Sequence, residues 1–97
     1  MFVAVLRLEL ILPEGSSLKD KRSVIKSIRE RLRHRFNISI AEVGYQDVLR
    51  RSEIGLAAVS SEAFYLEGLL DKIINHVEND GRVEVQTIER EIFKNES

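Results

Sequence analysis

The stretch FVAVLRLELIL, Phe2–Leu12, alternates between two kinds of position, and this alternation decides the fold. Successive side chains of a β-strand point to opposite faces, so a period of two predicts a strand with one buried face. The buried face is predicted to hold Phe2, Ala4, Leu6, Leu8, Leu10 and Leu12. The other face mixes apolar and charged residues: Val3, Val5, Arg7, Glu9 and Ile11.

A helix is predicted directly after this strand, over residues 18–35. The segment Pro13-Glu14-Gly15-Ser16 interrupts the strand. Ser17 is a suitable N-cap, and Asp20, three residues later, completes an acidic variant of the capping box. The apolar residues that follow recur at helical spacing. They are Leu18, Val24, Ile25, Ile28, Leu32 and Phe36.

The remaining chain repeats the same kinds of pattern. Three further strands are predicted, over residues 37–44, 53–60 and 82–92. A second helix is expected to begin after an N-cap at Ser60 or Ser61 and to end at Asn79-Asp80-Gly81. In the last strand the apolar alternation changes phase, which predicts a β-bulge near Gln86 or Thr87.

The order of these elements, βαββαβ, is typical of the ferredoxin-like α+β fold, here as a single domain of residues 1–97. Right-handed crossovers place both helices on one face of a four-stranded antiparallel sheet. The first and third strands are then central. The other face of the sheet is left open.

The composition excludes several kinds of site. The chain has no cysteine and only two histidines, His34 and His76, so disulfides, thiolate zinc sites and multi-histidine metal centres are excluded. We expect no metal and no cofactor.

No stretch approaches the roughly 18 apolar residues of a membrane helix, so we expect no membrane partner and a cytoplasmic location. Glu42 and Asp47 flank Gly44 as a carboxylate pair, but no histidine or nucleophile lies near them in the sequence, and we expect no enzyme.

The first helix is strongly basic. Five cations recur at i, i+3, i+7, i+10 and i+14 and therefore form one row, the basic row: Lys19, Arg22, Lys26, Arg29 and Arg33. Solvated helices usually alternate charges, because like charges at this spacing repel. An RNA phosphate backbone would compensate for that repulsion. We expect Arg50 and Arg51 to extend the row. A contact with an acidic protein, or a merely solvated face, remains as an alternative.

The open face of the sheet suggests a second kind of contact. Its central positions carry no aromatic residue, which disfavours the base stacking used by many RNA-binding sheets. Small aliphatic residues instead predict an apolar patch that a second copy of the chain would cover. The predicted dimer interface consists of Val3, Val5, Ala57 and Val59. The alternative is a monomer whose patch stays exposed to water.

The whole chain resembles the YlxP-like family of small bacterial proteins. The resemblance rests on VLRLEL (residues 5–10), SLKDKR (17–22), AEVG (41–44) with Gln46-Asp47, and Val59-Ser60-Ser61. It implies a ferredoxin-like fold, and the position of the family's genes near translation and ribosome-maturation genes implies a connection with RNA or the ribosome. Histidine is common in the family where this chain has Tyr45, which argues against essential histidine chemistry there. No catalytic residue follows from the resemblance.

These observations predict a non-enzymatic accessory protein that associates with RNA or a ribosomal particle through its first helix. The alternative is a homodimeric protein-interaction or small-ligand-binding module that uses the open face of the sheet.

Overall fold

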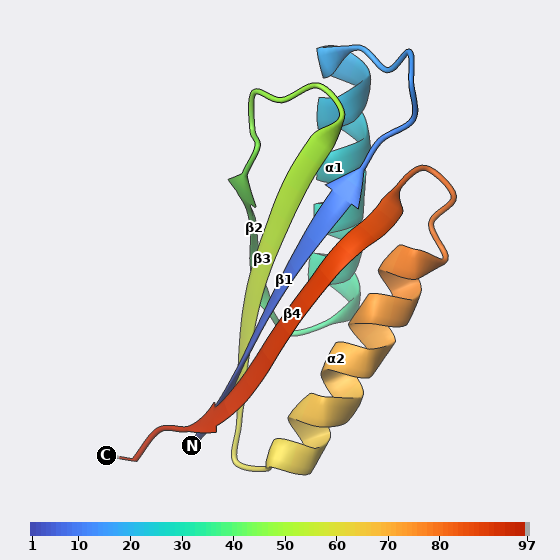
Figure 1. The fold of residues 1–97 in the computed structure, drawn as a ribbon. Coiled ribbons are helices and arrows are strands. Elements are labelled where there is room, and N and C mark those ends of the chain that lie inside the picture. The colour runs from blue at the N-terminus through green and yellow to red at the C-terminus, as the bar shows by residue number, and fades with distance from the viewer. Residues whose placement is uncertain (97) are drawn as a thin grey trace.

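The computed structural model describes residues 1–96 and has the predicted order of elements. Figure 1 shows one twisted sheet with both helices behind it. The elements are β1 (Phe2–Ile11), α1 (Leu18–Arg35), β2 (Ser39–Gly44), β3 (Arg51–Ser60), α2 (Ala63–Glu78) and β4 (Glu84–Lys94). The fold prediction is therefore confirmed, including both boundaries of the first helix.

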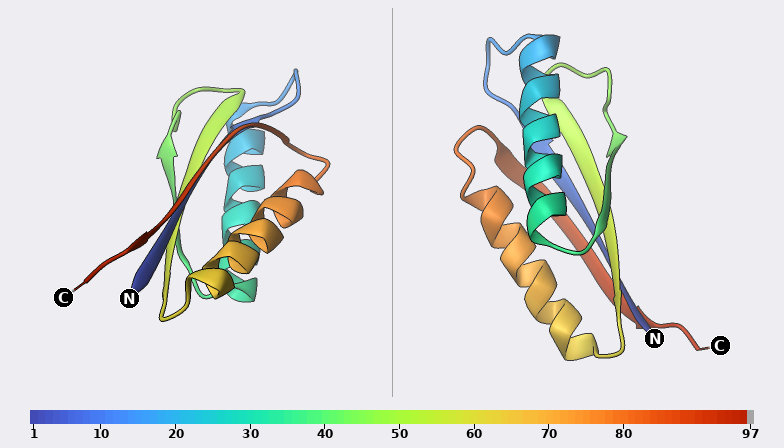
Figure 2. Two further views of the ribbon diagram at one scale, coloured as in Figure 1. Left: turned by 60° about the horizontal axis from the view of Figure 1, so that its bottom comes forward. Right: turned by 180° about the vertical axis from the view of Figure 1, so that it is seen from behind.

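The sheet is antiparallel and has the strand order β2-β3-β1-β4, so β1 and β3 are central as predicted. The view from behind in Figure 2 shows α1 and α2 side by side over one face of the sheet. The pairing of β1 with β4 shifts where Glu9 faces Thr87 and Leu10 faces Val85. Gln86 is the extra residue between them, so the predicted bulge is confirmed.

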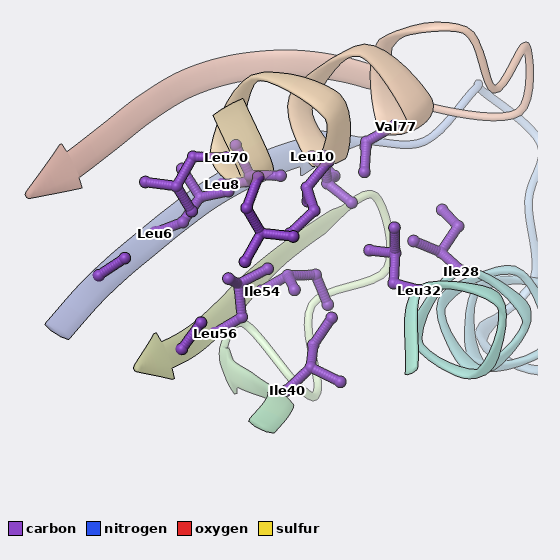
Figure 3. Packing of buried hydrophobic residues seen from close by; sticks show 14 of the residues in the cluster. Leu6, Leu8, Leu10, Ile28, Leu32, Ile40, Ile54, Leu56, Leu70 and Val77 are labelled. Atoms are coloured by element: carbon purple, nitrogen blue, oxygen red, sulfur yellow. The ribbon is translucent and has the colours of Figure 1, made fainter. Parts of the chain in front are cut away.

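One hydrophobic core lies between the sheet and the two helices (Figure 3). The sheet contributes the leucines of β1 together with Ile54 and Leu56 of β3. From the helices come Ile25, Ile28 and Leu32 on α1 and five residues on α2. The strict alternation of β1 thus places every second side chain in the core, and the intervening side chains point to the open face.

The helix ends agree with the sequence at α1 and differ at α2. Ser17 caps α1, and both hydrogen bonds of the capping box with Asp20 are 3.0 Å long. The N-cap of α2 is Glu62, whose side chain makes no capping bond, so the prediction of Ser60 or Ser61 is wrong. Ser60 Oγ instead accepts a hydrogen bond from the Glu62 amide, which forms a turn before the helix.

Candidate nucleic-acid interface

All five residues of the basic row lie on α1, along the flank of the helix next to its buried stripe. The row covers positions 19–33 and is therefore roughly 21 Å long. Lys19, Arg22, Lys26 and Arg33 are exposed, and Arg29 is half-buried. The structure thus brings the predicted residues together on one face.

Few carboxylates neutralise this row. Within residues 1–96, the one ion pair that involves it joins Lys26 Nζ to Glu30 Oε1 at 4.0 Å. Arg33 Nη2 donates a 3.3 Å hydrogen bond to the carbonyl oxygen of Ile40, on the edge strand β2. The Nε of Arg29 is buried and has no hydrogen-bond partner among the described residues. Arg33 therefore leans toward β2 and Arg29 is partly buried, while the rest of the row extends into solvent.

The two arginines that were expected to extend the row lie in different places. Arg51 is the first residue of β3, and its parity along the strand places it on the open face, where it pairs with Glu9 and lies 5.0 Å from the centre of the Tyr45 ring. Arg50 donates a 3.2 Å hydrogen bond to the Leu12 carbonyl oxygen and lies 3.9 Å from Glu14. Arg51 therefore points away from the helices, whereas Arg50 lies beside the segment that precedes α1 and stays a predicted contact.

A buried lysine fixes the connection between β2 and β3. The side chain of Lys21 is only 1% exposed. Its ammonium group donates hydrogen bonds to the carbonyl oxygens of Tyr45, Gln46 (3.2 Å) and Val48 (2.7 Å). Because a buried ammonium must have its three donors satisfied, the connection has to fold around Lys21.

Glu42 supplies the negative charge for this buried lysine. Its Oε2 lies 3.5 Å from Lys21 Nζ and accepts a 2.6 Å hydrogen bond from Ser52 Oγ. Asp47 is exposed on the connection. Glu42 therefore belongs to a stabilising network with Lys21 and Ser52.

The connection also contains an unusual backbone conformation. Tyr45 has a φ of 58°, in the left-handed region that residues with a Cβ rarely adopt. Its carbonyl oxygen accepts hydrogen bonds from Lys21 Nζ and from the Val48 amide. These two bonds hold Tyr45 in place and direct its ring toward Arg51.

The open face has an apolar end and a charged end. Val3, Val5, Ala57 and Val59 lie on it as predicted, since Val3 pairs with Val59 and Val5 pairs with Ala57. Phe93, which pairs with Val3, is 40% exposed and adds an aromatic ring that the sequence analysis did not assign to this face. At the charged end, Arg7 binds both Glu53 (3.1 Å) and Glu89 (3.5 Å).

A shallow groove of about 440 Å³ crosses the open face between these two ends. Gly55 lies on its floor, and a Cβ there would come within 3.1 Å of both methyl groups of Val43. The groove is lined by Val5, Arg7, Val43, Gly55, Glu89 and Glu91, among others. The missing side chain at Gly55 therefore lets Val43 pack onto the sheet.

A strong surface ion pair lies beyond the end of α2. Arg82 Nη2 is 2.7 Å from Asp80 Oδ2, and the hydrogen bond with this guanidinium lowers the pKa of Asp80 to about 2. Arg82 also donates to Ser27 Oγ of α1 at 3.3 Å. Asp80 and Arg82 thus connect the segment after α2 to α1.

Residues 1–96 contain neither a cluster of metal ligands nor a membrane-spanning helix. No group of three acidic or histidine side chains is placed to hold a metal ion. Neither of the two helices is sufficiently long and apolar to span a bilayer.

Comparison with known proteins identifies the family. Residues 3–90 match the family described as a protein of unknown function (DUF503). The chain belongs to the DUF503 family. A DUF503 relative, the uncharacterized protein YlxP of Bacillus subtilis (strain 168), is 40% identical over 82 residues, which are 84% of this chain and 88% of YlxP. The predicted resemblance is therefore confirmed.

Two solved structures share this arrangement of strands and helices. The de novo designed protein Foldit4 superposes on this DUF503 chain with a TM-score of 0.56 at 15% identity, covering 99% of this chain and all of Foldit4. A proposed chlorite dismutase, TA0507, gives a TM-score of 0.55 at 14% identity and covers 97% of this chain, which spans 45% of that protein. At such low identity the similarity concerns the fold alone.

The burial of Lys21 was not predicted, although the helical pattern contains a signal for it. Lys21 stands four residues before Ile25 and seven before Ile28, so it occupies a core position of the helical stripe. A lysine at such a position is buried only if a carboxylate or several carbonyl groups meet it. Glu42, inside the AEVG motif, is the acid that does so.

Proposed function

We propose that this protein is a cytoplasmic, non-enzymatic accessory protein that binds the phosphate backbone of RNA, on its own or in a ribosomal particle, through the basic row of α1. The observation that supports this proposal most is the continuous run of Lys19, Arg22 and Lys26. All three are exposed, and among the residues that the structure describes their only ion pair is the 4.0 Å contact between Lys26 and Glu30.

The half-buried Arg29 adds to this argument. Its unpaired Nε carries the cost of a buried donor without an acceptor. A modest rotation of the guanidinium toward a phosphate oxygen would remove that cost. Arg29 stands three residues after Lys26 and four before Arg33, so neighbouring phosphates could be held by successive members of the row.

The rest of the surface favours α1 over other elements as the RNA-binding surface. Residues 1–51 carry 11 Lys and Arg against 6 Asp and Glu, whereas residues 52–97 carry 4 against 10. The exposed side of α2 contributes Glu67 and Asp71, both of which pair with Arg90. A polyanion approaching the molecule is therefore attracted to α1 and repelled from α2.

The proposal is tested by co-sedimentation of the protein with ribosomal particles, and by its binding to RNA, at two salt concentrations. Binding should weaken as salt rises, because counterions released from the phosphates drive the association. Replacement of Arg22, Lys26 and Arg29 by glutamate should abolish it. If the folded triple variant co-sediments like the parent, the basic row is not the contact.

A second candidate function, a homodimeric interaction module, is favoured by the exposure of Val59 (62%) and Phe93 (40%) on the open face. The two functions do not exclude each other, because α1 and the open face lie on opposite sides of the sheet (Figure 2).

A further inference from the structure

RNA binding through α1 leaves the apolar patch on the open face of the sheet without a function. Four aliphatic positions and one aromatic ring are gathered at one end of a sheet face that no helix covers. Isolated exposed apolar side chains are common on protein surfaces, but a contiguous patch is typical of an interaction site.

We infer that a second copy of this chain covers the open face, sheet against sheet, so that the dimer carries two basic rows on its opposite outer surfaces and binds long RNA at both. The second half of this inference rests on the proposed RNA binding; the first half does not.

The area of the face fits a second copy. Three strands of ten or eleven residues and the shorter β2 give a planar footprint of roughly 600 Å². A standard interface buries about 800 Å² on each partner, and the corrugated accessible surface exceeds the planar footprint. The apolar end alone, about half of the face, is too small for a stable contact. The dimer therefore has to use most of the sheet and should form at micromolar concentrations.

The charged end permits such a contact. Arg7 is held by Glu53 and Glu89, and Arg51 by Glu9, so a second copy buries charges that are already paired. Carboxylates nevertheless outnumber guanidinium groups there, since Glu91 adds a further acid beside Val5. Two such ends repel each other weakly. Dimerisation should therefore strengthen with salt, whereas RNA binding should weaken.

The arrangement of the layers then sets the geometry for RNA. Packed sheets lie about 10 Å apart, and each helix layer adds about 10 Å, so the two α1 helices of a dimer are roughly 30 Å apart. An RNA that reaches both rows binds with avidity, and a short RNA binds one row only.

Sedimentation equilibrium at tens of micromolar tests the dimer, with Val59→Asp as the variant and Phe64→Asp as the control. Phe64, at the start of α2, is 90% exposed and lies off the open face, so both substitutions add a charge at an exposed apolar residue. We expect the parent and Phe64→Asp to dimerise, more tightly at higher salt, and Val59→Asp to remain monomeric with an unchanged circular dichroism spectrum. A monomeric parent, or a dimer that Phe64→Asp disrupts and Val59→Asp does not, overturns the inference.

Oligouridylates of about 10 and about 40 nucleotides test the bivalent binding. Val59→Asp should bind the short RNA like the parent and the long RNA at least tenfold more weakly. If Val59→Asp is monomeric and still binds the long RNA like the parent, the two rows do not act together. If neither the parent nor Val59→Asp binds either RNA although the parent dimerises, the proposed function is wrong and the inference of a dimer is retained.

Discussion

The ammonium group of Lys21, fully buried beneath the β2–β3 connection, donates a 2.7 Å hydrogen bond to the carbonyl oxygen of Val48. Together with its bonds to Tyr45 and Gln46 and its ion pair with Glu42, this contact makes a helix residue the organising centre of a distant connection. Lys21 therefore differs from every residue of the basic row, although it stands between two of the row's members in sequence.

Replacing Lys21 by methionine should lower the free energy of unfolding by about 3 kcal/mol, because Glu42 loses its countercharge and three carbonyl groups each lose one donor. Lys19→Met is the matched control, since Lys19 is exposed on the same helix and should change stability by about 0.5 kcal/mol or less. Chemical denaturation of both variants measures the difference. Equal stability of the two would contradict the structural role of Lys21. Faster hydrogen exchange at the Val48 amide, which donates to the Tyr45 carbonyl, should accompany the loss.

The ion pair of Asp80 with Arg82 makes stability depend on pH. Because the pKa of Asp80 is about 2 in the folded protein and ordinarily 3.8, its contribution is complete above the ordinary pKa and is lost as the pH falls toward 2. Asp80→Asn removes the charge and keeps an oxygen that can accept from the Arg82 amide. Near neutral pH this variant should be less stable than the parent by about 1 kcal/mol, a value reduced for the solvent exposure of Arg82. Denaturation curves should converge near pH 2, and a difference that persists there would show that charge is not the cause.

The close approach of Val43 to Gly55 predicts a compensating pair of substitutions. Gly55→Val should destabilise the protein by about 2 kcal/mol, because its Cβ alone would lie 3.1 Å from the methyl groups of Val43. Val43→Ala in the same chain removes those methyl groups and should restore part of the loss. A double-mutant cycle in denaturant measures the coupling. Strictly additive effects would mean that the two side chains do not compete for space.

The fold could be predicted because its signals are local. The period of two in β1, the capping box of α1 and the phase change in β4 each depend on a few neighbouring residues, and each appears in the structure. The start of α2 was placed wrongly because either serine could cap a helix. Ser60 instead forms a turn with the Glu62 amide, and that choice depends on how the end of β3 meets the core.

The candidate site was less predictable because it depends on contacts between distant residues. Lys21 and Glu42 are 21 positions apart, and nothing in either motif alone requires the pairing. Arg51 was assigned to the connection because β3 was predicted to begin at residue 53. The two additional strand residues place it on the open face, where Glu9 meets it. Phe93 lies on the open face because the bulge at Gln86 determines which residues of the following part of β4 point to that side.

The salt dependence of RNA binding tests the central claim, that the basic row of α1 holds a phosphate backbone. Fluorescence anisotropy with a labelled oligouridylate should give a linear decrease of log K with log salt concentration, with a slope of about −0.7 for each phosphate contact. Arg22→Glu/Lys26→Glu/Arg29→Glu should weaken binding and make the slope shallower by about 2, in line with three lost contacts. Lys72→Glu/Lys94→Glu reverses two exposed cations outside α1, controls for a large part of the change in net charge, and should leave the slope unchanged. Circular dichroism on the same samples confirms that the variants are folded. An unchanged slope and affinity in the folded triple variant would contradict the account.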